Sequence, residues 1–79
     1  MTVTFQNNYG ASRKWTIWDT GIDPNAPAII FNNYLDVNAV TGPLTVYDLG
    51  AGQGKAQYQR SDGPLFAIDV SDGSTVPMN

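Results

Sequence analysis

Hydrophobic and polar residues alternate along most of the chain, which is the pattern of β-strands that bury one face. The clearest examples are Val3 and Phe5 between threonines, and Trp15 and Ile17 between polar or outward-facing neighbours. Clusters of Asn, Asp, Gly and Pro separate the alternating segments, as expected for turns. The pattern predicts strands at residues 2–6, 14–19, 28–31, 35–40, 44–49, 56–58 and 65–70.

The last residues and the spacing of the strands complete the predicted architecture. Residues 76–78 are expected to form at most an edge strand, because Pro77 lacks the N–H that a central strand needs. No segment shows the 3.6-residue period of an amphipathic helix. We therefore expect one all-β domain over residues 1–79, a small antiparallel β-sandwich or barrel of about seven or eight short strands with negligible helix.

The inward positions of the predicted strands define the expected hydrophobic core. Alternation places every second side chain of a strand on the same face, so one set of apolar residues can share a single interior. The predicted core consists of Val3, Phe5, Trp15, Ile17, Ile29, Phe31, Leu35, Val37, Leu44, Val46, Tyr58, Phe66, Ile68 and Val70.

Composition supports the strand assignment and removes several kinds of chemistry. All seven acidic residues are aspartates, so the chain lacks the glutamates common on helix surfaces. It has no Cys and no His, hence no disulfides, no thiolate metal cluster and no imidazole base. The one carboxylate within an apolar strand, Asp69, is predicted to face outward, which does not favour a buried general acid. We expect a binding module rather than an enzyme, with no catalytic residues, no cofactor and no metal ligands.

Charge limits the partners. The net charge is −3, and only 14% of residues are charged, compared with about a quarter in an average protein. Nucleic-acid affinity depends on clustered cations, and Arg13 and Lys14 are the only adjacent pair among four. No run approaches the roughly 18 apolar residues that span a bilayer. We expect no nucleic-acid partner and no transmembrane segment.

Aromatic residues outside the predicted core form the candidate site. If Trp15 and Ile17 face inward, alternation turns Trp18 to the opposite face, with Tyr47 on or near that face. Tyr9 and Tyr34 each follow two asparagines, in segments that we expect to form turns. The predicted ligand-binding residues are Trp18, Tyr9, Tyr34, Tyr47, Asn32 and Asn33.

Flat aromatic rings beside amides are suited to sugars, because the rings stack on C–H faces while the amides bond hydroxyls. We therefore expect a lectin-like carbohydrate-binding β-sandwich. Alternatives are a protein–protein interaction module (an inhibitor or an assembly subunit) that uses the same aromatics as anchors, or a small membrane-active β-sandwich. The ligand would be a glycan or a protein. A homo-oligomer also remains open, because a core of this size rarely contributes more than about 3–5 kcal/mol.

Overall fold

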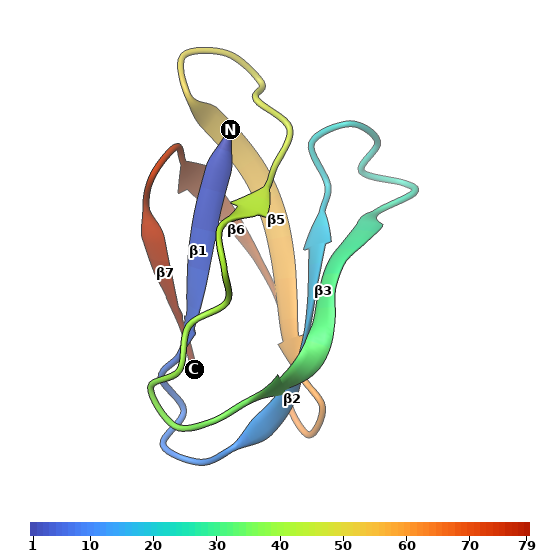
Figure 1. Ribbon diagram of the computed structural model, residues 1–79. Helices are drawn as coiled ribbons and strands as arrows, with labels where there is room; N and C mark the ends of the chain where they lie inside the picture. Colours follow the sequence, from blue (N-terminus) through green and yellow to red (C-terminus); the bar gives the residue numbers. More distant parts are fainter.

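A computed structural model describes the whole chain, residues 1–79, as strands joined by turns and loops, without helix (Figure 1). This confirms the predicted all-β sandwich architecture. No helix long and apolar enough to cross a membrane is present. The strands are β1 (Thr2–Asn7), β2 (Arg13–Asp19), β3 (Ala28–Leu35), β4 (Leu44–Thr45), β5 (Gln53–Arg60), β6 (Leu65–Ser71) and β7 (Thr75–Met78).

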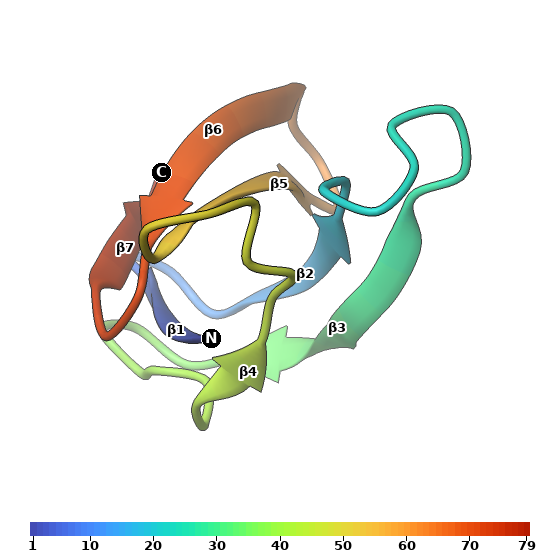
Figure 2. The same ribbon diagram turned by 90° about the horizontal axis from the view of Figure 1, so that it is seen from above.

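The seven strands form two sheets that face each other, as the view from above shows (Figure 2). One sheet has three strands in the order β4-β1-β7, and the other has four in the order β3-β2-β5-β6. Neighbouring strands run antiparallel except for β1 and β7, which run parallel. The edge position predicted for the C-terminal segment is confirmed, because β7 pairs only with β1 and carries Pro77.

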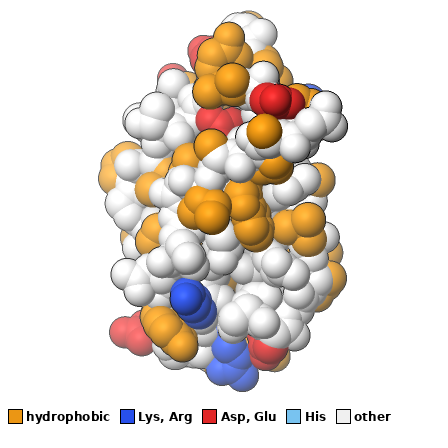
Figure 3. Space-filling view, turned by 90° about the vertical axis from the view of Figure 1, so that its right-hand side faces the viewer, with side chains coloured by type: hydrophobic (Ala, Val, Ile, Leu, Met, Phe, Trp, Pro, Cys, Tyr) orange, Lys and Arg blue, Asp and Glu red, His pale blue; other side chains and the backbone are white.

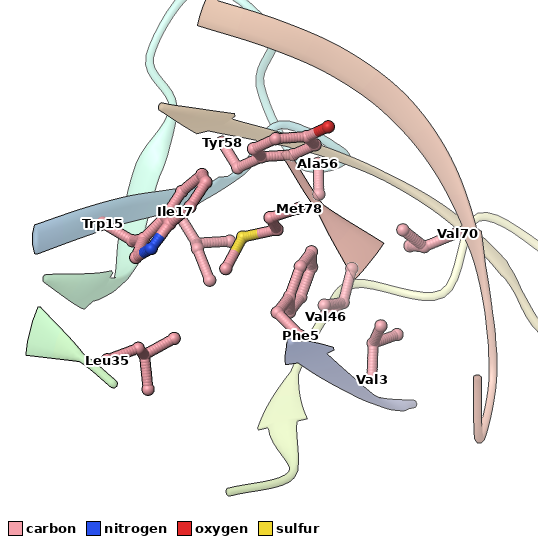
Figure 4. Close-up of a cluster of buried hydrophobic side chains, with 10 residues drawn as sticks. All are labelled: Val3, Phe5, Trp15, Ile17, Leu35, Val46, Ala56, Tyr58, Val70 and Met78. Atoms are coloured by element: carbon pink, nitrogen blue, oxygen red, sulfur yellow. The ribbon is translucent and has the colours of Figure 1, made fainter. Parts of the chain in front are cut away.

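The core lies between the two sheets. The side chain of Met78 lies between those of Ile17 and Phe5, so the C-terminal strand helps to join the layers (Figure 4). On the larger sheet, the rings of Trp15 and Tyr58 pack with their centroids 6.0 Å apart. The buried hydrophobic residues are Val3, Phe5, Trp15, Ile17, Leu35, Val46, Ala56, Tyr58, Val70 and Met78.

Three residues of the predicted core are exposed, each for a different reason. Ile29 is 59% exposed because a register shift between Ile17 and Trp18 pairs it with Trp18, which faces away from the core. Val37 is exposed because its segment forms no strand. Phe66 faces the core side of β6 but remains 42% exposed, because β6 is an edge strand. Predicted core members Phe31, Leu44 and Ile68 are half-buried against the core.

Two predicted strands differ from those in the structure. Residues 36–40 form a turn in which Asn38 adopts a left-handed backbone with φ of 62°, and a single bridge joins Val40 to Gln6. Asparagine tolerates this conformation, which interrupts a strand. The predicted 44–49 strand is limited to Leu44–Thr45. Alternation of apolar and polar residues therefore predicted strands that are too long here, because it does not show where the neighbouring strand ends.

Two buried polar side chains of the core, those of Asn7 and Trp15, differ in their hydrogen bonding. The Asn7 side-chain amide donates to the carbonyls of Ala11 (2.8 Å) and Leu35 (2.9 Å), and its oxygen accepts the N–H of Tyr9. It therefore holds the β1–β2 loop against the end of β3. The indole Nε1 of Trp15, by contrast, is buried without a hydrogen-bond partner. Such a group costs about 1–3 kcal/mol of folding free energy.

Candidate functional site

The solvent side of the four-stranded sheet, called the outer face below, carries the candidate site. Residues that pair across neighbouring strands lie on the same side of a sheet, so the strand register defines this face. Every member is exposed or half-buried, because no other element covers the sheet on this side. The outer face consists of Lys14, Thr16, Trp18, Ile29, Asn32, Tyr34, Lys55, Gln57, Gln59, Leu65, Ala67 and Asp69.

Trp18 occupies the central row of the outer face. It pairs with Ile29 on β3 and Gln57 on β5, and Gln57 pairs in turn with Ala67 on β6. Trp18 is half-buried and does not belong to the core cluster. The space-filling view of the side of the molecule on which β3 lies shows hydrophobic side chains in the middle and charged groups below and above them (Figure 3).

The next row provides polar groups. Thr16 pairs with Asn32 on β3 and Gln59 on β5, and the Thr16 hydroxyl donates to the Asn32 side-chain oxygen over 3.3 Å. Tyr34 follows Asn32 two positions later on β3 and is well exposed. It lies in a strand, although the sequence pattern placed it in a turn. These amides and hydroxyls can both donate and accept hydrogen bonds.

A shallow hollow of about 260 Å³ lies at the other end of the outer face. There the Lys55 ammonium donates to the Asp69 carboxylate over 2.9 Å, and Thr20 contributes to the wall. Both charged side chains are well exposed, so the pair contributes little to stability. It does neutralise this end of the face.

The groups that β5 contributes to the outer face are not among the ligand-binding residues predicted from the sequence. The alternating pattern of residues 53–60 could have identified them. Ala56 and Tyr58 face the core, so Lys55, Gln57 and Gln59 must face outward. The contribution of these groups depends on β5 lying beside β2, which is a pairing between segments far apart in the chain.

The structure brings Trp18, Asn32 and Tyr34 together on the outer face and places the other three predicted residues elsewhere. Asn33 lies on the opposite side of the sheet, paired with Trp15, and its side-chain oxygen accepts the N–H of Tyr34 over 2.8 Å. Asn33 therefore does not contribute to the outer face.

Tyr9 lies in the β1–β2 loop, where it contacts two arginines. The guanidinium carbon of Arg60 is 3.7 Å from the centre of the Tyr9 ring, and that of Arg13 is 5.4 Å away. Both guanidinium groups donate to the carboxylate of Asp62. The hydrogen bond from Arg60 lowers the pKa of the Asp62 carboxyl, and the hydrogen bond from Arg13 adds a smaller decrease. Partial desolvation opposes both effects. Arg60 therefore occupies one face of the Tyr9 ring.

Tyr47 lies at the other end of the sandwich. Its backbone N–H donates over 2.8 Å to the carboxylate of Asp19, the last residue of β2, and the N–H of Gly21 donates to the second oxygen. The buried Asp19 thus fixes the loop that carries Tyr47. Because β2 starts at Arg13 near Tyr9 and rises by about 3.3 Å per residue, the two tyrosines are roughly 20 Å apart and cannot share a small ligand.

Comparison with protein-family models, with curated proteins and with solved structures finds no match to this chain. The sandwich and the outer face therefore provide the basis for a functional proposal.

Proposed function

We propose that the chain is a non-enzymatic carbohydrate-binding module and that its outer face binds the glycan. The supporting observation is Trp18, a half-buried indole in the central row of an uncovered sheet face, with Gln57 beside it and Thr16 and Asn32 in the next row. A half-buried indole is partly held by its neighbours and keeps part of its ring accessible for stacking on the C–H face of a sugar. The amides and hydroxyls provide partners for sugar hydroxyls.

The charge of the face favours a neutral glycan. Lys55 and Asp69 neutralise each other, which leaves Lys14 as the remaining charged side chain of the outer face. A strongly anionic or cationic ligand would therefore find little charge complementarity here. The regular strands hold the side chains in place, so that binding requires little ordering of the protein.

A protein ligand is the second candidate, and a different observation favours it. Ile29 lies next to Trp18 on the outer face, and Ile22 in the β2–β3 loop is 72% exposed. Large apolar side chains in such exposed positions are typical of interaction surfaces. A protein partner would use Ile22 and Ile29 as anchors, whereas a glycan would depend on Trp18 and the amides.

A glycan array and isothermal titration with the best oligosaccharide test the proposal. We expect saturable binding to neutral glycans that Trp18→Ala and Gln57→Ala weaken, while Tyr47→Ala, away from the outer face, leaves it unchanged. Ile22→Ser serves as the control for a protein ligand and should not affect glycan binding. Absence of binding to any glycan, or equal losses in the Tyr47→Ala control, would contradict the proposal. Binding to lipid vesicles without glycan binding would favour the membrane-active alternative.

A further inference from the structure

Four strands form the edges of the two sheets, and three of them carry features that discourage pairing with another chain. Edge strands expose unpaired N–H and C=O groups, which proteins protect with short strands, prolines, bulges or charges. β4 has only two residues, β7 contains Pro77, and β3 is interrupted by its register shift. β6 has seven residues that pair with β5 in an unbroken register, and it contains no proline or lysine. Its one charged residue, Asp69, is paired with Lys55 of the neighbouring strand.

The backbone groups on the open side of β6 follow from its hydrogen bonds. Asp72, just after the strand, donates its N–H to Gly52 on the β5 side over 2.8 Å. The backbone groups of successive strand residues point alternately to the two sides of the strand. Residues at even positions therefore point toward β5, as Asp72 does, whereas Leu65, Ala67 and Asp69 point their N–H and C=O groups toward the open edge. β6 has no second neighbour in its sheet, so no strand pairs with these groups. Figure 2 shows β6 along one rim of the molecule.

The side chains at this edge are also incompletely covered. Leu65 is exposed on the outer face, and Phe66 on the core side is 42% exposed although its ring packs on Tyr58 at 5.4 Å. The exposed part of β6 runs from Leu65 to Asp69, since Val70 is buried and the carbonyl of Ser71 already accepts the N–H of Ser74. An added strand therefore has a defined stretch of five residues to pair with.

We propose that β6 pairs antiparallel with β6 of a second copy of this chain, about a two-fold axis at Ala67. Ala67 is the middle residue of the exposed stretch, so this register uses all the open groups of both copies. Ala67 pairs with Ala67 of the second copy, and Leu65 pairs with its Asp69, giving about six backbone hydrogen bonds at two for each pair. On the core side, Phe66 of one copy lies opposite Ile68 of the other.

The chemistry of β6 is compatible with a copy of itself. In this register each Asp69 lies opposite a leucine rather than the other Asp69, and Lys55 neutralises it within its own chain. Ala67 places only methyl groups at the axis, so that the two strands can approach without steric conflict. A two-fold contact is closed, and the protected edges at β3, β4 and β7 do not extend it. The expected product is a dimer rather than a fibre.

The dimer would join two four-stranded sheets into one. The central row of the outer face would then continue through Ala67 and Gln57 of the second copy to its Trp18. The two Trp18 side chains would lie on the same side, five strand spacings of about 4.8 Å apart, or roughly 24 Å. The pairing uses the sheet edge and does not depend on the nature of the ligand.

Sedimentation velocity and light scattering over a range of concentrations, without any sugar, test the dimer. Because a single strand pair buries less than the roughly 1,200–2,000 Å² of a stable interface, we expect a dimer that dissociates on dilution. Ala67→Pro removes an N–H that points away from β5, so it should abolish the dimer without removing a bond within the sheet. Ala67→Ser keeps the N–H and a small side chain at the axis, and should still dimerise. A monomeric wild type at all concentrations, a dimer that persists in Ala67→Pro, or growth beyond dimers would overturn the proposal.

Disulfide cross-linking tests the register and does not depend on how well Ala67→Pro folds. The chain has no cysteine, so a single introduced thiol can react only between copies. Paired residues of this type have Cα atoms about 5.5 Å apart, within the 4.4–6.8 Å range of disulfides. Ala67→Cys should therefore cross-link efficiently under mild oxidation, and Thr75→Cys on the edge of the other sheet should not. Equal cross-linking of both variants would contradict pairing through β6.

Discussion

The solvent sides of the two sheets differ in composition, although both belong to the same small sandwich. The strands of the three-stranded sheet present small or polar residues outward, namely Thr2, Thr4, Gln6, Thr45, Thr75 and Pro77, and the exposed Val40 is bridged to Gln6 beside them. The outer face of the four-stranded sheet carries Trp18, Ile29, Tyr34 and Leu65 among its polar groups. Threonine has high strand propensity and keeps a sheet surface hydrated. The first face therefore shows that this fold needs no exposed aromatic rings, and the aromatic residues of the second face are the difference on which the proposed binding role rests.

The largest expected effects come from residues buried between the sheets, such as Ile17 and Trp15, rather than from residues on either face. Ile17→Ala removes a fully buried side chain and should cost about 2–5 kcal/mol of unfolding free energy. Thr4→Ala on the three-stranded sheet should stay within about 0.5 kcal/mol, as for ordinary surface sites. Urea denaturation followed by tryptophan fluorescence measures both. A lower midpoint for Thr4→Ala than for Ile17→Ala would show that the inward and outward positions have been exchanged.

The two tryptophans sharpen the comparison further. Trp18→Ala should reduce the free energy of unfolding by less than about 1 kcal/mol, as at a surface site, while it weakens ligand binding by about 2 kcal/mol or more if the ring is a hot spot. Trp15→Ala should destabilise the fold by about 3–5 kcal/mol, since its ring is buried. Thermal melts and ligand titration of both variants test this. If Trp18→Ala unfolds the chain, the ring is structural and the outer face loses its main binding group.

Phe66 is expected to show an intermediate effect. Full burial would place the cost of Phe66→Ala at about 3–5 kcal/mol, but the ring is 42% exposed at the edge of its sheet. We expect about 2 kcal/mol for the dilute monomer, in proportion to the area that is buried. Denaturation at low and high protein concentration separates this cost from any loss of dimer. A cost of about 3–5 kcal/mol in the dilute monomer, as for a fully buried ring, would show that the edge is better covered than the structure indicates.

A smaller effect is expected for Trp15→Phe. The change removes the buried indole N–H that lacks a partner, which offsets part of the packing that is lost. The net cost should therefore stay near about 1 kcal/mol, well below that of Trp15→Ala. Paired denaturation curves of the two variants provide the measurement. Equal destabilisation by phenylalanine and alanine would indicate that the indole N–H finds a partner in solution.

The smallest effect concerns Asp62, which lies on neither face. Because folding lowers its pKa below the ordinary value of 3.8, its ionised form stabilises the folded chain above that pH. The stabilisation is lost as the pH falls through the lower pKa of the folded state. The melting temperature of the wild type should thus fall slightly more than that of Asp62→Asn between pH 5 and pH 2. Parallel pH profiles for the two proteins would show that the arginine contacts contribute nothing.

The sequence by itself determined the fold class and the orientation of the clearest strands. Alternation around Trp15 and Ile17 turned Trp18 outward, and the structure places it on the face opposite the core. This works because neighbouring side chains of a strand must point to opposite sides. The turn residues likewise separated the strands without knowledge of their partners.

Only the tertiary structure decided which residues share a surface. The strand order brings Gln57 and Gln59 of β5 beside Trp18 and Thr16, and the register shift in β3 turns Ile29 outward. The same order leaves β6 at an edge, exposes Phe66 and separates Tyr9 from Tyr47. Periodicity reports the side to which a residue points within its own strand. The strand that lies alongside depends on pairing between distant segments, which the local pattern does not contain.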